Sequence, residues 1–472
     1  MSTPDERIAA LESEVVALRA QVQDLLAQNQ ELRARLAKDS HNSAKPPSTD
    51  PLGHKRPRSQ RRRSGKKPGG QLGHPGETLH LVTTPDEVVE HRAPVCAACQ
   101  APLDATAVLV GIERRQVQDL PPVRLQVTEH RALHVRCPHC AQVNVGVFPA
   151  EAASRAQYGP RLRALAVYLG EQQLVPYARV RELLADLLGA HLSVGTLIRW
   201  VAQGAEVLRP VEVAIKAALL RAPVLHSDET GVRRAGKLAW AHVASTARRT
   251  HYAIHPKRGR EATEAIGILP AYRGVSVHDG LRSYRAYRQC RHALCNIHHL
   301  RELTFLEEQY HQAWAKELKG LLLAMKAAVD QARTRGDTRL LTGERDAFRA
   351  RYDELMVAGL AANPLPQRQP GQKGRLKQSP PRNLLERLWL GQEAVLAFLD
   401  DFTIPFDNNQ AEQDLRMLKV QQKIAGSFRA ESGAEAFARI RGYCASLRKQ
   451  GVALLAALQT AFTGQPLYPA LD

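Results

Sequence analysis

The chain is short of long apolar runs, of acidic residues and of cysteines. No stretch of about 18 uncharged apolar residues occurs, so no membrane span is expected. The N-terminus shows no basic segment followed by an apolar one, so we expect a cytoplasmic protein rather than a secreted one. Seven cysteines in a reducing compartment favour metal binding over disulfides. Lys and Arg number 66 against 47 Asp and Glu, and the net charge of +19 predicts a polyanionic partner.

With 472 residues the chain is too long for one compact core, so several domains are expected. Residues 1–38 are expected to form a coiled coil, because apolar residues recur every seven positions. β-branched residues at a with Leu at d favour a parallel two-stranded form, and a lone polar a residue fixes register. The alternative is an amphipathic helix packed on its own protein. The a positions are Ile8, Val15, Val22, Asn29 and Leu36, and the d positions are Leu11, Leu18, Leu25 and Leu32.

Residues 39–80 combine Pro, Gly and positive charge, which prevents a core and predicts a flexible basic linker. Nine Lys or Arg and one Asp lie between residues 41 and 67. Such a run can be merely solvated, but in a basic protein we favour an arm that binds DNA phosphates. The expected contacts are Arg61, Arg62, Arg63, Lys66 and Lys67.

Residues 81–150 contain two Cys-x-x-Cys pairs separated by strand-like segments at 107–112 and 123–127. Two such pairs predict a zinc ribbon, in which four thiolates close a tetrahedral and therefore structural Zn²⁺ site. The long gap between the pairs predicts an extended hairpin. We interpret His91 and His139 as bystanders. The predicted ligands are Cys96, Cys99, Cys137 and Cys140.

Residues 151–212 are expected to be helical. Apolar spacing predicts helices at 161–169 and 180–188, then a turn, then a helix that Ser193 caps. Helix, glycine-containing turn and helix match a helix-turn-helix, although many helical hairpins never touch DNA. If the second helix enters a groove, Thr196 and Arg199 would read it.

The pattern changes at residue 213, and residues 213–304 predict a mixed sheet with helical cover that resembles the ribonuclease H-like fold. Expected strands end at Asp228 and Asp279, others lie at 238–244, 250–254 and 292–297, and a helix lies at 261–268. Residues 305–400 are expected to form a helical insertion, broken at 363–381. Residues 401–430 carry a helix with Glu412, and residues 431–472 a final helical segment.

Three acids, Asp228, Asp279 and Glu412, sit where two strand ends and one helix could converge. Carboxylates are the ligands that Mg²⁺ prefers, and two such ions stabilise the attacking and leaving oxygens of a phosphoryl displacement. Strand alternation predicts that only one of Asp228 and Glu229 joins the site.

Each acid also has a structural interpretation. A strand-end turn would account for Asp228, an Asp-Gly turn for Asp279, and a capping box over 409–412 for Glu412. A basic stripe follows Glu412 on one helix face and would suit DNA phosphates, the alternative being an ion pair between Glu412 and Arg416. The stripe comprises Arg416, Lys419 and Lys423.

Taken with these motifs, the chain resembles the TnpC-type DDE transposases of the insertion sequence 66 family. The resemblance implies that Asp228, Asp279 and Glu412 are catalytic and hold two Mg²⁺ or Mn²⁺ ions. It implies a bacterial, nucleoid-associated DNA transposase that cleaves element ends and transfers the freed strand, with His298 and Arg301 near the site. Double-stranded DNA, a homodimer or higher oligomer and accessory proteins of the same element are the expected partners. The matching segments are 42–47, 69–71, the cysteine pairs, 227–230, 279–280 with Tyr284, Cys295 with His298 and Arg301, 407–416, 426–429 and 433–434; Gln413 and residues 421–423 depart from the pattern.

Three alternatives remain open. The chain could be a non-catalytic, zinc-containing DNA-binding accessory or regulatory protein. It could be a tyrosine recombinase using His298, Arg301 and Tyr443. A second metal site could also form from Cys290, His292, Cys295 and His298.

Overall fold

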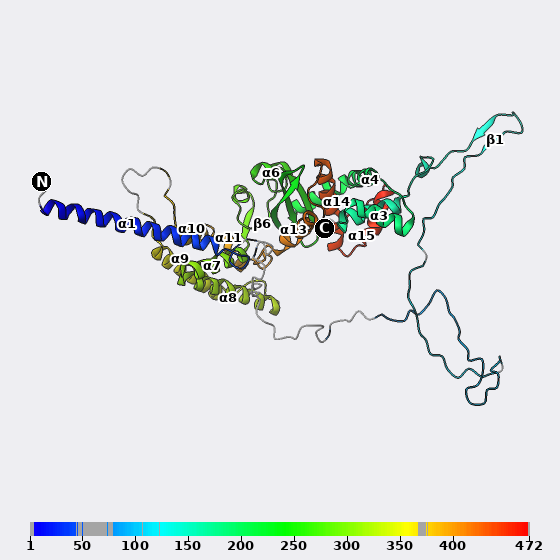
Figure 1. The fold of residues 1–472 in the computed structure, drawn as a ribbon, viewed down its shortest axis with the longest axis horizontal. Helices are drawn as coiled ribbons and strands as arrows, with labels where there is room; N and C mark the ends of the chain where they lie inside the picture. The colour runs from blue at the N-terminus through cyan, green and yellow to red at the C-terminus, as the bar shows by residue number, and fades with distance from the viewer. Residues whose placement is uncertain are drawn as a thin grey trace. The chain divides into compact units, whose positions relative to one another are not determined.

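A computed structural model of the protein describes residues 4–43, 45, 50, 73, 79–105, 107–121, 123–366, 374 and 376–470. The chain divides into two compact units. The smaller comprises Arg58–Gln126, and the larger comprises Met1–Pro57 with Val127–Asp472. The larger unit contains the sheet and the helices that position the three acids (Figure 1).

The larger unit is built on a five-stranded mixed sheet with strand order β5-β4-β3-β6-β7. The first three strands in sequence are antiparallel neighbours, whereas β6 and β7 run parallel to β3. A two-residue turn with positive φ at Ala235 and Gly236 joins β3 to β4, as right-twisted hairpins require. The strands are β3 (Val224–Arg234), β4 (Lys237–Ser245), β5 (Thr250–His255), β6 (Val275–His278) and β7 (Arg291–Leu294).

The parallel register between β3 and β6 places two of the acids side by side. β6 pairs with β3 only from Val224 to His226, whose partner is Val277. Two residues further along each chain, Asp228 and Asp279 therefore follow at the same level of the sheet edge. β3 continues along β4 as far as Arg234, so Asp228 is held on a long strand while β6 has already ended.

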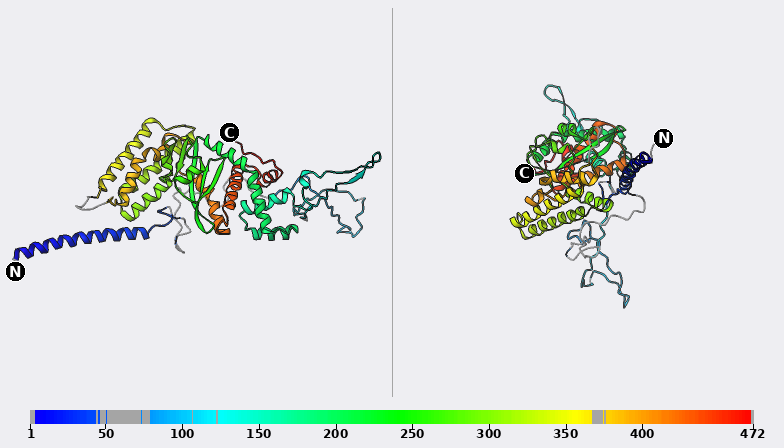
Figure 2. Two further views of the ribbon diagram at one scale, coloured as in Figure 1. Left: turned by 90° about the horizontal axis from the view of Figure 1, so that it is seen from above. Right: turned by 90° about the vertical axis from the view of Figure 1, so that its left-hand side faces the viewer.

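Helices from the C-terminal part cover one face of the antiparallel strands (Figure 2). α13 (Asn409–Ala425) packs on β3 and β4, and α14 (Glu431–Lys449) packs on β5. Apolar side chains of both helices, including Leu415 and Phe437, are buried against the strands in one core. This packing sets the position of Glu412, which lies in the first turns of α13.

A second core holds the helical insertion between β7 and α13. The sequence prediction of a helical insertion is therefore matched, but with different ends. α7 begins at Asn296, so the strand expected at 292–297 is wrong beyond Leu294. The expected break at 363–381 is also too long, because helix α10 starts at Pro380. The insertion contains α7 (Asn296–Tyr310), α8 (Ala313–Arg335), α9 (Thr342–Ala362), α10 (Pro380–Leu390), α11 (Gln392–Val395) and α12 (Ala397–Asp400).

Helices also precede the sheet, and their ends follow the sequence signals. Gly189 ends α3 in the left-handed region with φ 66°, where a residue without Cβ is favoured. Ser193 caps α4 as predicted, its side chain accepting from the Thr196 backbone N–H. α15 (Leu454–Phe462) packs on α2. These helices are α2 (Pro160–Val167), α3 (Tyr177–Leu188), α4 (Val194–Val207) and α5 (Arg209–Leu220), with a π-helical segment η3 (Tyr168–Gln172) after α2.

Two segments with strand-like sequences are not strands in the structure. Within the described residues, 107–112 and 123–127 have no sheet partner, and their apolar side chains are exposed, Val110 at 97%. The two-stranded pairing occurs later, between β1 (His134–Arg136) and β2 (Val143–Val145). Propensity alone therefore misplaced these strands, because nothing packs on the side chains that prompted the prediction.

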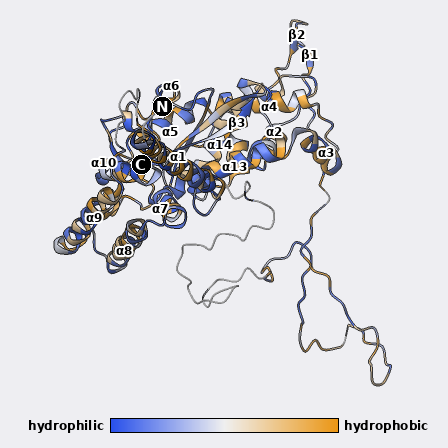
Figure 3. Ribbon diagram, turned by 60° about the vertical axis from the view of Figure 1, so that its left-hand side comes forward, coloured by the Kyte–Doolittle hydropathy of each residue, from blue (hydrophilic) through white to orange (hydrophobic). Residues whose placement is uncertain are grey.

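Helix α1 (Pro4–Leu36) is continuous over the predicted heptads. Its apolar heptad residues are exposed in the single chain, for example Leu11 at 61% and Leu25 at 63%, and they alternate with polar residues along the helix (Figure 3). An apolar stripe left in water is what a coiled-coil strand shows before it meets its partner. A search of the described helices finds none with the length and hydropathy needed to cross a membrane.

Candidate metal-binding active site

Three carboxylates converge at the point in the sheet where β6 ends and β3 continues beyond it. Asp228, Glu229 and Asp279 each offer an oxygen, and these oxygens lie within 4.8 Å of one another. The Asp228 Oδ1 accepts from the Glu229 backbone N–H at 2.8 Å, and the Asp279 Oδ1 accepts from the Leu281 N–H at 2.9 Å. Asp279 therefore forms the turn expected of an Asp-Gly pair and still faces the other acids, so its structural and functional interpretations are compatible.

The expectation that only one of Asp228 and Glu229 can join the cluster is wrong. Side chains do alternate along β3, but the longer Glu229 side chain reaches the same place, where β6 no longer stands beside the strand. Arg258 fixes the Glu229 carboxylate through its Nε at 2.8 Å, and the Tyr284 hydroxyl donates to its other oxygen. The position of the Glu229 carboxylate in the cluster is therefore fixed by Arg258 and Tyr284.

Electrostatics show how crowded the negative charge is. Burial, followed by the charges of Glu229 and Asp279, raises the pKa of Asp228 to about 8, and the Glu412 carboxylate pushes in the same direction. Burial also raises the pKa of Glu229. A carboxyl with a pKa above neutrality holds a proton unless a cation replaces it. A bound divalent ion would therefore reduce the repulsion between these carboxylates.

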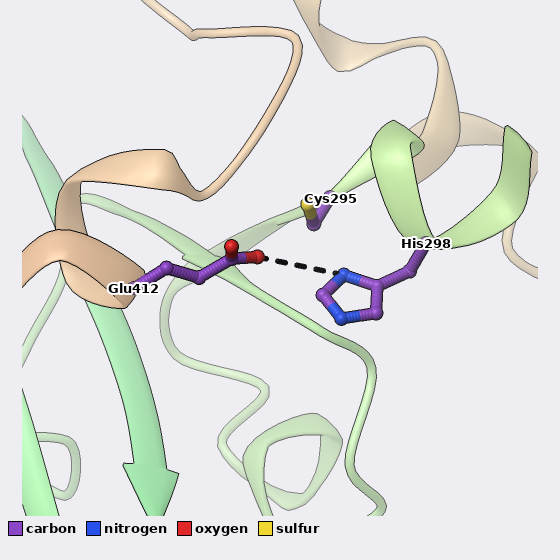
Figure 4. A group of neighbouring side chains, drawn as sticks. All are labelled: Cys295, His298 and Glu412. Atoms are coloured by element: carbon purple, nitrogen blue, oxygen red, sulfur yellow. Dashed lines mark ion pairs between the residues drawn. The ribbon is translucent and has the colours of Figure 1, made fainter. Parts of the chain in front are cut away.

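Glu412 approaches from α13 and faces two residues at the start of α7. One ligand atom from each of Glu412, Cys295 and His298 lies within 4.8 Å of the others (Figure 4). The Glu412 Oε1 lies 4.0 Å from the His298 Nδ1. Both atoms are buried, and neither has a hydrogen-bond partner among the described residues. Buried polar atoms are normally paired, so a cation bound between these two atoms would satisfy both of them.

The helix start differs from the sequence prediction. α13 begins at Asn409 with Asn408 as its N-cap and without a side-chain cap, so the capping box expected over 409–412 is wrong. Glu412 is then one position deeper in the helix, and its carboxylate is not used to close the helix end. Both residues of the alternative ion pair are described, and Arg416 does not pair with Glu412: it is exposed. The structural interpretations of Glu412 therefore fail.

Asn408 carries the contacts that bring the third acid to the sheet, and sequence reasoning gave it no role of its own. Its side-chain Nδ2 donates to the Ser227 carbonyl at 2.9 Å, and its Oδ1 lies 2.8 Å from His226 Nδ1. Its backbone N–H donates to the Cys295 Sγ at 3.2 Å. The signal was a run of polar residues, 407–409, directly after the buried Phe406.

The donor set fits hard divalent cations. Asp228, Asp279 and Glu412 offer carboxylate oxygens, which Mg²⁺ and Mn²⁺ accept, and Glu229 adds a fourth. The orphaned Oε1 of Glu412 and the raised pKa of Asp228 both indicate that positive charge would be favourable here. The structure brings Asp228 and Asp279 directly together and places Glu412 close enough to repel Asp228.

The structure does not support two of the alternative chemistries. The proposed Cys290, His292, Cys295 and His298 set is separated, because His292 Nδ1 bonds to His278 Nε2 at 3.0 Å and Cys290 donates to the Tyr287 carbonyl. Tyr443 is 2% exposed. Its hydroxyl donates to the Ala457 carbonyl, so it is not presented as a nucleophile.

Several predicted DNA contacts are on the surface. Arg199 on α4 is exposed, as is the basic stripe of α13, whereas Arg301 on α7 is half-buried. Thr196 is half-buried, and its hydroxyl lies 3.0 Å from the Ser193 Oγ. Their roles toward DNA stay predictions. Arg61, Arg62, Arg63, Lys66 and Lys67 lie outside the described residues.

Each of the two cysteine pairs forms a turn, and the two turns are of the same type. In the first, the Cys96 N–H donates to the Ala101 carbonyl and Gln100 has φ 61°; in the second, the Cys137 N–H donates to Gln142 and Ala141 has φ 60°. Hydrogen bonds from the backbone of Cys99 and of Cys140 are the first cause that lowers the pKa of the Cys96 and Cys137 thiols, respectively. Such turns aim N–H groups at a thiolate, the form that binds zinc.

Comparison with protein families defines the class and then the family. Residues 87–141, which contain both cysteine pairs, match the zinc-finger binding domain of transposase IS66, so the chain is a zinc-finger transposase that binds DNA. Residues 2–80 match a family of unknown function. The model of the transposase IS66 family matches residues 155–436, more than half of the chain and all three acids, and the protein belongs to this family. No curated protein matches the chain.

Proposed function

We propose that the protein cleaves DNA at the ends of its insertion sequence and joins the freed strand to a target by a DDE mechanism. The observation that carries the proposal is the meeting of Asp228 and Asp279 at one sheet edge, with Glu412 on α13 near enough for its charge to raise the pKa of Asp228. A DNA-binding regulator without catalytic activity would have no need to group Asp228, Glu229 and Asp279 at the cost of raising the pKa of Asp228.

The fold supports the proposal. Three antiparallel strands followed by two strands parallel to the first, in the order β5-β4-β3-β6-β7, correspond to a ribonuclease H-like core. In that interpretation Asp228 follows from the first core strand, Asp279 from the fourth, and Glu412 from the helix after the insertion. In this arrangement Asp228 on β3 and Asp279 directly after the neighbouring β6 lie at the same level of the sheet.

In the proposed reaction, water attacks the phosphodiester at the element end and frees a 3′-OH, which then attacks a target phosphate. Two Mg²⁺ or Mn²⁺ ions, held by Asp228, Asp279 and Glu412, would supply Lewis-acid stabilisation of the attacking and leaving oxygens. Asp228 must first give up its proton, because the neutral acid is a poor ligand. Arg258 and Tyr284 keep Glu229 in place while this charge changes.

Other parts of the chain would bring DNA and partners to the site. We propose that α1 forms a coiled-coil homodimer or higher oligomer through its exposed heptad residues, and that Cys96, Cys99, Cys137 and Cys140 hold one structural Zn²⁺. The basic linker, Arg199, Arg301 and the basic stripe of α13 would contact phosphates of double-stranded DNA. The proposed location is the bacterial nucleoid, with accessory proteins of the same element as further partners.

The decisive experiment incubates purified protein with labelled element ends in Mg²⁺ or Mn²⁺. Asp279→Asn and Glu412→Gln should each lower cleavage by at least about 100-fold, since loss of even an indirect metal contact costs 10- to 100-fold. Binding in Ca²⁺ should persist. Asp346→Asn, an exposed acid on α9, is the matched control and should cleave normally. Unchanged cleavage by the two active-site variants would refute the assignment of these acids, whereas binding without cleavage by the wild type would favour the non-catalytic alternative.

A further inference from the structure

A pocket of about 500 Å³ adjoins the acidic cluster and is lined by three separate parts of the larger unit. Asp279 and Gly280 form the side toward the acids, α7 and α10 form the walls, and Lys38, Asn42 and Ser43 close it from the segment after α1. Its size lies within the range of 300–1,000 Å³ typical of ligand sites. Asp279 is shared between the pocket and the acidic cluster, so the pocket lies directly beside the proposed cleavage site.

Two arginines in this pocket carry hydrogen-bond donors that nothing uses. Arg285 Nη2 and Arg387 Nε are buried and have no partner among the described residues. Arg387 donates through its Nη2 to Glu302, so only part of its charge is matched. Arg285 forms none of the ion pairs found in the described part of the chain. Burial and the charge of Arg387 lower the pKa of Arg285, so each guanidinium is held against the repulsion of the other.

Two glycines lie beside the Arg285 guanidinium. Gly280 has φ +94°, and a Cβ there would lie 3.5 Å from Arg285 Nη2. A Cβ at Gly391 would lie 3.8 Å from the same atom and 2.9 Å from the Arg387 carbonyl. The guanidinium therefore passes between two glycines, one of which directly follows the catalytic Asp279. A buried arginine with an unused N–H is characteristic of a binding site for an oxyanion.

We propose that Arg285 and Arg387 bind one backbone phosphate of the DNA strand that enters the active site. The inference rests on the proposed function for its ligand, because a strand held at Asp279 brings further phosphates within reach of the same pocket. Lys38 adds a third positive charge, and its Nζ lies 4.9 Å from the centre of the Phe305 ring. Phe305, Leu306 and Leu384 leave an apolar wall beside which the attached sugar fits.

The segment after α1, which closes the pocket, is itself held against α7. His41 lies 3.4 Å from Glu308, and the Asn42 Nδ2 donates to Glu308 at 3.3 Å, so this segment is fixed to α7 (Figure 2). Ser40 and Asn42 are buried. The coiled-coil helix and the pocket are thereby joined by a short, held stretch of chain.

The test measures binding of a duplex bearing the element end, in Ca²⁺, with a single uncharged methylphosphonate placed in turn at each position near the cut. Wild-type binding should weaken by about 10- to 100-fold at one position, the value of a charge-assisted hydrogen bond. Arg285→Gln should lose the same factor on unmodified DNA and become insensitive to that one substitution. Arg387→Gln should behave alike, whereas Arg288→Gln, an exposed neighbour, should match the wild type.

The proposal would be overturned if Arg285→Gln bound the DNA as tightly as wild type does. It would also be overturned if this variant remained as sensitive as wild type to a methylphosphonate at every position, so that the two losses multiplied throughout. Circular dichroism of both variants, compared with wild type, excludes loss of fold as the cause. The assay needs no strand cleavage. Absence of cleavage by wild type in Mg²⁺ would refute the proposed function alone, whereas a flat methylphosphonate profile would refute the phosphate pocket alone.

Discussion

Binding of Mg²⁺ or Mn²⁺ to the acidic cluster should release a proton, and the structure sets the amount. The pKa of Asp228 is raised to about 8 by burial and by Glu229 and Asp279. At pH 7 an acid with that pKa is about 0.9 protonated, at pH 8 about 0.5 and at pH 9 about 0.1. A metal ligand must be ionised, so these fractions are the protons expelled on binding. The raised pKa of Glu229 makes 0.9 a lower bound at pH 7.

Titration calorimetry in two buffers of different ionisation enthalpy measures this release directly on the zinc-loaded protein. Apparent affinity should fall roughly tenfold for each pH unit below about 7, because protons compete with the cation. The pH dependence of metal-free stability has the opposite sign: a raised folded-state pKa favours the protonated fold, so metal-free stability from this group is lost as the pH rises from about 4 through about 8. Release below about 0.2 proton at pH 7, or equal release by Asp228→Asn and wild type, would refute the reasoning.

Two further predictions concern the supports of the site. Asn408→Ala should lower the free energy of unfolding by about 2–3 kcal/mol in urea, followed by tryptophan fluorescence, because it leaves the buried Ser227 carbonyl and His226 unpaired; an effect below about 0.5 kcal/mol would contradict its bridging role. Cys96→Ser and Cys137→Ser should each reduce bound zinc from one to none per chain in elemental analysis, while Cys295→Ser retains it; zinc retained by the first two would contradict the four-thiolate site.

The strands that carry the acids could be predicted because their signals are local. Apolar runs ending in Asp228 and Asp279 indicate β3 and β6, although β3 does not end at Asp228 as predicted but continues along β4 to Arg234. Ser193 indicates the start of α4 by its capping side chain. Helix ends were predicted less well where tertiary contacts decide. Asn296 begins α7, and its backbone N–H donates to the Phe406 carbonyl. This partner lies more than a hundred residues away, so no local pattern reveals it.

The composition of the site was predictable only in part for the same reason. Period-two alternation is a rule for regular sheets, and it failed for Glu229 because β6 ends before that residue. The unused donors of Arg285 and Arg387 depend on the packing of α10 on α7, which sequence spacing does not encode. Glu412 could be predicted from its place near the start of a helix, whereas Asn408, which places it, emerged only from its contacts.

The helical insertion also fixes when the active site can exist during synthesis. Asp228 and Asp279 leave the ribosome together with most of the sheet, but α7 to α12 must be made and folded before α13 can dock. Closing so long a loop is slow compared with forming the local strands. A growing chain therefore completes the proposed DNA-binding regions before the three acids can come together, so a C-terminally truncated product would bind DNA but lack the proposed active site.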